Sequence, residues 1–267
     1  MIKISRGKSF IRKKVFILPI LSKIMRIKVH LHGSGVLPFN YHYHLSSALY
    51  TYKKIADEEL ATRLHYSREI KTFTFSEIMI PKRKITKEGI KFLDDYAYFI
   101  YSAPSKDYVE AVVEGMLSNP EFRVGKFRFM IEKIEVLPTP NVDWHDVTFK
   151  TLSPISLYSS SDGRKKEPLY PTDTLWYVNL EKNIKHEYLV FYGEEPRGRI
   201  DITTLHFKPK KYEFRKVEKG KVVEGAIKAV HGHFRFRGNP ELIKFAYEAG
   251  VGERGAWGFG CLDVVSE

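Results

Sequence analysis

Two kinds of hydrophobic pattern divide the chain into predicted strands and helices. Segment 26–32 (RIKVHLH) alternates charged and apolar residues, which is typical of a half-buried strand, and 96–102 (YAYFIYS) is also predicted to be a strand. In 109–117, apolar residues recur with the i, i+3, i+4, i+7 and i+8 spacing of an amphipathic helix, which Asn119 and Pro120 end. The residues that carry this spacing are Val109, Val112, Val113, Met116 and Leu117.

The first half of the chain contains six such segments. A break in its first helix is expected near Asp57. Strands are predicted at 26–32, 72–80 and 96–102, helices at about 43–66 and at 109–117, and a long strand or hairpin at 122–137. The order β-α-β-β-α-β is that of a ferredoxin-like unit.

The second half repeats this plan. Asn239 and Pro240 form a strong helix start, and Gly250 stands where that helix should end. The predicted elements are a strand at 147–158, a helix at 173–186, strands at 199–217 and 221–237, the helix from 240, and a strand at 258–265. The sequence therefore predicts an α+β protein of two tandem ferredoxin-like (βαββαβ) domains, with a glycine-rich loop before the last strand. A proline-containing linker separates an N-terminal domain, 25–140, from a C-terminal domain, 141–267.

Charge is concentrated at the start of the chain. Residues 1–24 hold seven Lys and Arg and no acid, whereas the rest of the chain has 37 bases and 32 acids. The apolar run VFILPIL in this segment has only seven residues and is followed by no cleavage site, so it is not a signal peptide. We interpret 1–24 as a basic extension, or as the product of a start codon assigned upstream of Met25. No stretch is long enough to span a membrane, and we expect a cytoplasmic protein.

Composition excludes some classes of site. One cysteine, Cys261, cannot form an intrachain disulfide or a cysteine-based zinc site. The absence of glutamine, together with abundant lysine and glutamate, resembles a thermophile's composition. A net charge of +12 is compatible with a polyanionic partner but does not require one.

The letters GVGERG at 250–255 match the dinucleotide fingerprint G-x-G-x-x-G. That fingerprint needs a strand before it and a helix after it, and here the predicted order is reversed. A nucleotide-binding reading is therefore excluded. The glycines at 250, 252, 255, 258 and 260 indicate either a loop whose backbone approaches a phosphate chain or a turn that closes the last strand.

Histidines supply several candidate sites. His42 and His44 could lie on one strand edge as metal ligands, although no carboxylate or cysteine cluster accompanies them. His65 ends the first helical region, with Lys71 six residues later and Tyr50 on the preceding helix. A histidine there is commonly only compatible with the helix dipole. By strand parity, one face of 221–237 carries a basic row that is either an RNA-compatible surface or a solvated one: His231, His233, Arg235 and Arg237.

The sequence resembles the Cas-six family of CRISPR repeat-processing endoribonucleases, within the repeat-associated RNA-binding superfamily. The resemblance rests on PFNYHYHLSSALY (38–50), LATRLHYSREIKTFTFS (60–76), TFKTLSPISL (148–157) and GVGERGAWGFG (250–260). These stretches occur in order and span nearly everything after Met25. Residues 1–24 lie outside the resemblance.

The resemblance implies a catalytic triad of Tyr50, His65 and Lys71, as in archaeal relatives. It implies metal-independent, cofactor-free cleavage in which a 2′-hydroxyl attacks the adjacent phosphate, leaving a 2′,3′-cyclic phosphate, or its ring-opened form, and a 5′-hydroxyl. Such a reaction needs a base, an acid and a positive charge beside the phosphorane. Relatives are usually described with tyrosine as base and histidine as acid. The chemistry leaves that assignment open, because tyrosine would need a strongly lowered pKa to act as a base.

The implied partner is CRISPR repeat RNA in the precursor of guide RNAs. A CRISPR effector complex and a second copy of the chain are further candidate partners. Basic side chains would follow the RNA backbone and aromatic ones would stack on bases. The candidate RNA-binding residues are Lys150, Lys208, Lys210, Arg235, Arg237 and Arg254, with Gly250, Gly252, Gly258 and Gly260 of the loop.

Three alternatives compete with this interpretation. The first is a paralogue that binds guide or repeat RNA and cuts weakly or not at all; intact Tyr50, His65 and Lys71 argue against it. The second is a general RNA-binding protein of a thermophile, which the glycine loop disfavours. The third is a metal-dependent hydrolase that uses His42 and His44.

Overall fold

The computed structural model describes residues 2–3, 25–56, 72–159, 166–218 and 221–265. Within it the chain packs as two compact units. The first unit comprises residues 1–68 and 78–139, and the second comprises residues 69–77 and 140–267. The second unit thus includes a short segment, 69–77, that sequence analysis placed in the N-terminal domain.

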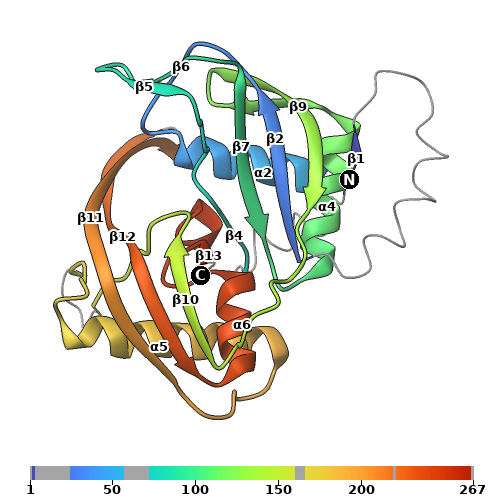
Figure 1. Ribbon diagram of the computed structural model, residues 1–267. Helices are drawn as coiled ribbons and strands as arrows, with labels where there is room; N and C mark the ends of the chain where they lie inside the picture. The colour runs from blue at the N-terminus through green and yellow to red at the C-terminus, as the bar shows by residue number, and fades with distance from the viewer. Residues whose placement is uncertain (1, 4–24, 57–71, 160–165, 219–220, 266–267) are drawn as a thin grey trace. The chain divides into compact units, whose positions relative to one another are not determined.

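The first unit contains an antiparallel sheet with two helices on one face (Figure 1). Along the sheet the strands follow the order β1-β9-β2-β7, and β8 pairs with β9. Val29 in the middle of β2 pairs with Phe99 on one side and Ile134 on the other. The elements are β1 (Ile2–Lys3), β2 (Arg26–His32), α2 (His42–Ala56), β7 (Tyr96–Ser102), α4 (Lys106–Ser118), β8 (Glu121–Val124) and β9 (Phe127–Val136).

The pattern of the sequence explains this packing. Ile27, Val29 and Leu31 on β2 are fully buried, as their alternation predicts. On α4 the apolar stripe is buried, and Gly115 allows close approach of the two helices. A Cβ at Gly115 would lie 2.2 Å from the carbonyl oxygen of Tyr52 on α2.

Two features of this region differ from the prediction. The strand predicted at 72–80 is only β4 (Thr74–Phe75), followed by an isolated bridge between Met79 and Tyr98. The reason is that the backbone amides beyond it bond to other partners: Ile78 N donates to the Tyr41 hydroxyl at 3.0 Å. A small sheet of order β3-β6-β5 was not predicted; its strands are β3 (Val36–Leu37), β5 (Arg83–Ile85) and β6 (Ile90–Phe92).

The second unit contains a sheet of order β11-β12-β10-β13, with α5 and α6 on one face (Figure 1). Its apolar core includes Phe149, Trp176 and Phe234. Asn239 caps α6 by accepting from the amide of Leu242 at 2.9 Å, as predicted. The elements are β10 (Asp146–Thr151), α5 (Thr174–Tyr192), β11 (Ile200–Glu218), β12 (Lys221–Gly238), α6 (Pro240–Ala249), the 3-10 turn η1 (Gly255–Trp257) and β13 (Leu262–Val264).

Some boundaries in this unit were also predicted wrongly. Strand β10 ends at Thr151 rather than at 158, and β13 begins at Leu262 rather than at 258. The residues just after β10 bond to the residue just before β13: the amides of Leu152 and Ser153 both donate to the carbonyl of Cys261. This local bonding replaces the continued strand pairing that the alternation suggested.

Both halves follow the order β-α-β-β-α-β along the chain, as β2-α2-β4-β7-α4-β9 and β10-α5-β11-β12-α6-β13. The protein is therefore an α+β protein with two tandem ferredoxin-like repeats. The 250–260 loop lies before the last strand, as predicted. Among the described helices, none is both long enough and apolar enough to cross a membrane.

Candidate functional site

Tyr50 lies on α2, on the flank that meets α4. Its ring packs with Tyr108 against the buried Ala111 of α4. Burial raises the pKa of Tyr50 above its ordinary value, and the neighbouring Tyr108 hydroxyl raises it further. Tyr50 therefore keeps its proton at neutral pH. The other two residues of the predicted triad, His65 and Lys71, lie outside the described residues.

Beside Tyr50 stands a buried lysine that sequence reasoning missed. Lys53, one turn further along α2, is fully buried. Its ammonium lies 5.4 Å from the ring centroid of Tyr50, 5.3 Å from that of Tyr101 and 5.5 Å from that of Tyr108. A cation at these distances is attracted to the ring faces. The signal was available, because Lys53 continues the i, i+4 apolar row of Leu45 and Leu49.

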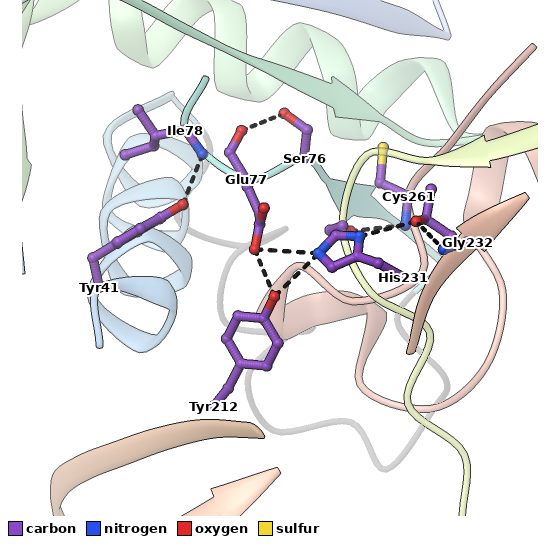
Figure 2. A network of polar contacts seen from close by, with 10 residues as sticks. Tyr41, Ser76, Glu77, Ile78, Tyr212, His231, Gly232 and Cys261 are labelled. Atoms are coloured by element: carbon purple, nitrogen blue, oxygen red, sulfur yellow. Dashed lines mark hydrogen bonds and ion pairs between the residues drawn. The ribbon is translucent and has the colours of Figure 1, made fainter. Parts of the chain in front are cut away.

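In the second unit, side chains from distant parts of the sequence form a polar chain, of which Figure 2 labels Glu77, Tyr212 and His231. The Tyr212 hydroxyl donates to Glu77 Oε1 at 2.7 Å and lies 3.1 Å from His231 Nε2. His231 Nδ1 lies 2.9 Å from Thr151 Oγ1. Thr151 Oγ1 in turn accepts from the amide of Gly232 at 3.0 Å. We call Glu77, Tyr212, His231 and Thr151 the relay.

One proton arrangement satisfies every bond of the relay. Because Thr151 Oγ1 already accepts from Gly232, its own hydrogen can be donated to His231 Nδ1. The imidazole can then donate from Nε2 to Tyr212, which donates to Glu77. The relay thus forms an ordered series of donors that links β10, β11 and β12 to the segment after β4.

The basic row on β12 faces away from the core, as strand parity predicted. Phe234 and Phe236 are fully buried on one face, whereas Arg235 and Arg237 lie on the other. Both arginines pair with one carboxylate: Arg235 makes two bonds of 2.6 Å to Asp146, and Arg237 makes one of 3.1 Å. The Arg235 guanidinium lowers the pKa of Asp146. These charges are therefore partly neutralised within the chain.

Other candidate basic residues lie on the same sheet. Lys150 of β10 pairs with Asp263 at 3.4 Å, whereas Lys208 and Lys210 on β11 are exposed. His233 lies opposite Lys150, and its Nδ1 is 2.9 Å from Nε2 of His206. Burial lowers the pKa of His233, and the neighbouring His206 and Lys150 lower it further.

The predicted glycines of the loop turn inward. All four are buried, and each amide donates to an acceptor of the same unit. Gly250, Gly252, Gly258 and Gly260 donate respectively to Ala246 O, Asn183 Oδ1, Gly255 O and Pro154 O, at 3.0, 2.8, 2.7 and 2.8 Å. An RNA contact through this loop would therefore use groups other than these amides, and the glycines' role as RNA contacts stays a prediction.

Arg254 is the exposed member of the loop. Its φ of 71° makes it the one non-glycine residue with positive φ among the described residues. Its guanidinium carbon lies 5.7 Å from the ring centroid of Tyr158 and 5.9 Å from that of Trp257. The two aromatic rings attract the guanidinium and restrain the side chain at the surface.

The metal-site alternative placed His42 and His44 on a strand edge, and this is wrong. Both lie in the first turn of α2, where residues i and i+2 do not face each other. His42 is buried and stacks on Tyr41 at 4.8 Å between ring centroids, whereas His44 lies against Gly125. Over the described ranges, no three His, Cys, Asp or Glu residues group to hold a metal ion.

Two family models match the chain in succession. The model described as CRISPR-associated protein Cas6, N-terminal, matches residues 36–135. The model described as CRISPR associated protein Cas6, C-terminal, matches residues 137–264. Together they cover almost all residues after 35.

Individual relatives match over nearly the full length. The CRISPR-associated endoribonuclease Cas6 1 of Methanocaldococcus jannaschii is 35% identical over 251 residues, covering 91% of this chain and 94% of that protein. A solved structure described as characterization of a Cas6-related gene from Pyrococcus furiosus has 31% identity and a TM-score of 0.80, covering 91% of this chain and 99% of that one. Another, described as an RAMP protein binding different RNA substrates, has 30% identity and a TM-score of 0.79, covering 91% and 100%.

Proposed function

The chain belongs to the Cas6 family, and from that membership we propose that it is an endoribonuclease that binds CRISPR repeat RNA and cleaves precursor transcripts within the repeat. The observation that carries the proposal is the likeness, over 91% of the chain, to a relative named as a Cas6 endoribonuclease. Tyr50 on α2 and the basic groups of the second unit agree with it. The product would be guide RNA.

The proposed reaction needs no metal ion. The 2′-oxygen of one nucleotide forms a bond to the adjacent phosphorus, the bond from phosphorus to the 5′-oxygen breaks, and a 2′,3′-cyclic phosphate and a 5′-hydroxyl result. His65 takes the 2′-hydroxyl proton, since imidazole titrates near neutral pH. Tyr50 donates toward the departing 5′-oxygen, because its burial keeps the hydroxyl protonated. Lys71 stabilises the added negative charge on phosphate.

RNA binding is proposed to use exposed cations of the second unit. Arg254, Lys208 and Lys210 are exposed at the surface, whereas Arg235 and Arg237 would exchange Asp146 for phosphate oxygens. Tyr158 and Trp257 flank Arg254 and offer aromatic faces to a base. An effector complex and a second copy of the chain stay predicted partners.

The test is cleavage of end-labelled repeat RNA in excess EDTA by wild-type protein and by His65→Ala. We expect cutting at a single site by wild type, a loss of about 10²–10⁴-fold in the variant, and no cutting of RNA with a 2′-deoxy substitution at the scissile nucleotide. Activity that EDTA abolishes would contradict the metal-free proposal.

A second candidate function is RNA binding without efficient cleavage. A relative described as an RAMP protein binding different RNA substrates favours it. Tight binding of repeat RNA by wild type without any cleavage would select this function.

A further inference from the structure

The glycine-rich loop, residues 250–260, packs directly on the short segment Thr72–Glu77. From Thr72 to Ser76 every residue of this segment is buried. Thr74 Oγ1 donates to the carbonyl of Phe259 at 2.9 Å. A Cβ at Gly258 would lie 2.1 Å from Cε2 of Phe75, which is closer than any such contact can be.

Two more glycines of the loop make the same kind of approach. A Cβ at Gly250 would lie 2.8 Å from Cγ2 of Thr74, and a Cβ at Gly255 would lie 2.9 Å from the carbonyl oxygen of Phe73. Because these three glycines have no side chain, the segment can pack directly against the loop backbone. Their spacing is explained by packing against the segment, and no phosphate is needed to explain it.

The far end of the segment is held by the relay. The amide of Glu77 donates to the carbonyl of Leu152 at 3.1 Å, and the Glu77 carboxylate accepts from Tyr212 at 2.7 Å. Tyr212 also packs edge-on against Phe259 of the loop, with 5.6 Å between ring centroids. Tyr212 thus contacts both the loop, through Phe259, and the segment, through Glu77. Together the loop and the relay contact the segment from Phe73 to Glu77.

The loop itself is tied to helix α5. Asn183 accepts from the Gly252 amide at 2.8 Å, and its side-chain nitrogen donates to Glu187 at 3.3 Å. The amide of Glu253 donates to the carbonyl of Ser156 at 2.7 Å. A loop bonded at these points can restrain what packs on it.

We infer that the glycine-rich loop and Tyr212 are positioning elements for the proposed cleavage, which hold the segment Thr72–Glu77 and act through Lys71, the residue that precedes it. This role rests on the proposed function. Lys71 is joined to Thr72 by a single peptide bond, so their Cα atoms are separated by about 3.8 Å. A shift of the segment is therefore passed to the backbone from which the lysine extends. Misplacement of a catalytic group by 1 Å can cost about 10²-fold in rate.

The first test is Gly258→Ala, with Gly193→Ala as the matched control. Both glycines have nearly the same backbone conformation, with φ of 79° and 74°, but a Cβ at Gly193 meets nothing within 4 Å. We expect Gly258→Ala to lower the single-turnover cleavage rate about tenfold or more, with the Kd for repeat RNA within about threefold of wild type. Gly193→Ala should leave both unchanged.

Two further variants separate positioning from folding. Phe75→Leu combined with Gly258→Ala removes two of the three ring atoms that the new Cβ would meet, Cε2 and Cζ, and should recover part of the rate. Tyr212→Phe removes only the hydroxyl that donates to Glu77, so this variant should fold even if Gly258→Ala does not. We expect a smaller loss of rate from it, about threefold to tenfold.

A double-mutant cycle decides whether the loop acts through the lysine. In a Lys71→Ala background, Gly258→Ala and Tyr212→Phe should cause no further loss of rate. Full additivity would overturn the inference. So would an unchanged rate in both single variants while hydrogen exchange of Thr72–Glu77 is accelerated. If wild type itself does not cleave, the proposed function fails, and this role fails with it; the exchange measurement then still reports the packing.

Discussion

A polar cluster lies against the helices in the first ferredoxin-like half and on the opposite face of the sheet in the second. In the first unit, Lys53 and the tyrosines around it lie where α2 and α4 cover the sheet. In the second unit, His231 and Tyr212 lie on the sheet face opposite the helices, beneath the glycine loop. The fold therefore places the buried Lys53 beside Tyr50 in the first half. In the second half, the corresponding sheet packs against the chain's own segment that ends at Glu77.

The two units therefore offer different side chains to the proposed reaction. The first unit supplies Tyr50 together with the fully buried Lys53. The second unit supplies exposed cations and a rigid loop whose glycine amides are already used. Substitution of Tyr50 or Lys53 should thus change the rate of cleavage, whereas substitution of the exposed cations of the second unit should change RNA affinity.

The largest effect is expected from Tyr50→Phe, with Tyr52→Phe on the same helix as the control. Tyr50→Phe should lower the cleavage rate about 10²–10⁴-fold, because it removes a proton donor. Tyr52→Phe should leave the rate unchanged but cost about 1 kcal/mol of stability, because the Tyr52 hydroxyl donates to the carbonyl of Glu121 at 2.6 Å. Single-turnover cleavage and thermal melting measure the two effects. Equal rates in both variants would remove Tyr50 from the mechanism.

A smaller effect is expected from Lys53→Met. Because Lys53 is fully buried it cannot contact RNA, so the Kd should stay unchanged while the rate falls about tenfold with the loss of a charge beside Tyr50. The exposed neighbour Lys54→Met is the control and should change neither. A weaker Kd for RNA in Lys53→Met, with an unchanged cleavage rate, would contradict the proposed effect of Lys53 on the rate.

In the second unit, Glu187 should make stability depend on pH. Burial raises the pKa of Glu187 from 4.5 to about 8. Between these values the folded chain holds a proton that the unfolded chain has lost, so this group lowers stability as pH rises through that window. Glu187→Gln should therefore melt at the same temperature as wild type near pH 4, and at least about 2 °C higher at pH 9. A difference in melting temperature between the two proteins that stays the same from pH 4 to pH 9 would contradict this.

The smallest effect is expected from Asp146→Asn. Removing this carboxylate frees the charges of Arg235 and Arg237, so RNA should bind a few-fold more tightly and with a salt dependence steeper by about one in log–log slope. Arg254→Ala should change the slope by a similar amount in the opposite direction. Fluorescence anisotropy across a salt series measures both. An unchanged slope in Asp146→Asn would place the RNA elsewhere.

Much of the fold could be predicted from the pattern of apolar residues. Strands 26–32 and 96–102 and the helix from Pro240 to Ala249 form at the predicted bounds, because their periodicity and capping agree. The strand expected at 72–80 does not, because its amides bond to residues far away in sequence, as Glu77 does to Leu152. Alternation reports which side chains are buried and carries no information about such partners.

The site was less accessible to sequence reasoning. Tyr50, His65 and Lys71 came from the family resemblance, since no spacing rule connects them. Lys53 was missed because a lysine on a helix is usually solvated. The relay could not be predicted, because Glu77, Thr151, Tyr212 and His231 meet only in the folded unit.

The central claim, cleavage by the RNA's own 2′-hydroxyl, is tested most directly by the chemical nature of the new ends. Mass spectrometry of both fragments from a repeat RNA cut once by wild type in EDTA would identify them. We predict a 2′,3′-cyclic phosphate, or its ring-opened phosphate, on one fragment and a 5′-hydroxyl on the other. A free 3′-hydroxyl with a 5′-phosphate would mean attack by water and would contradict the account.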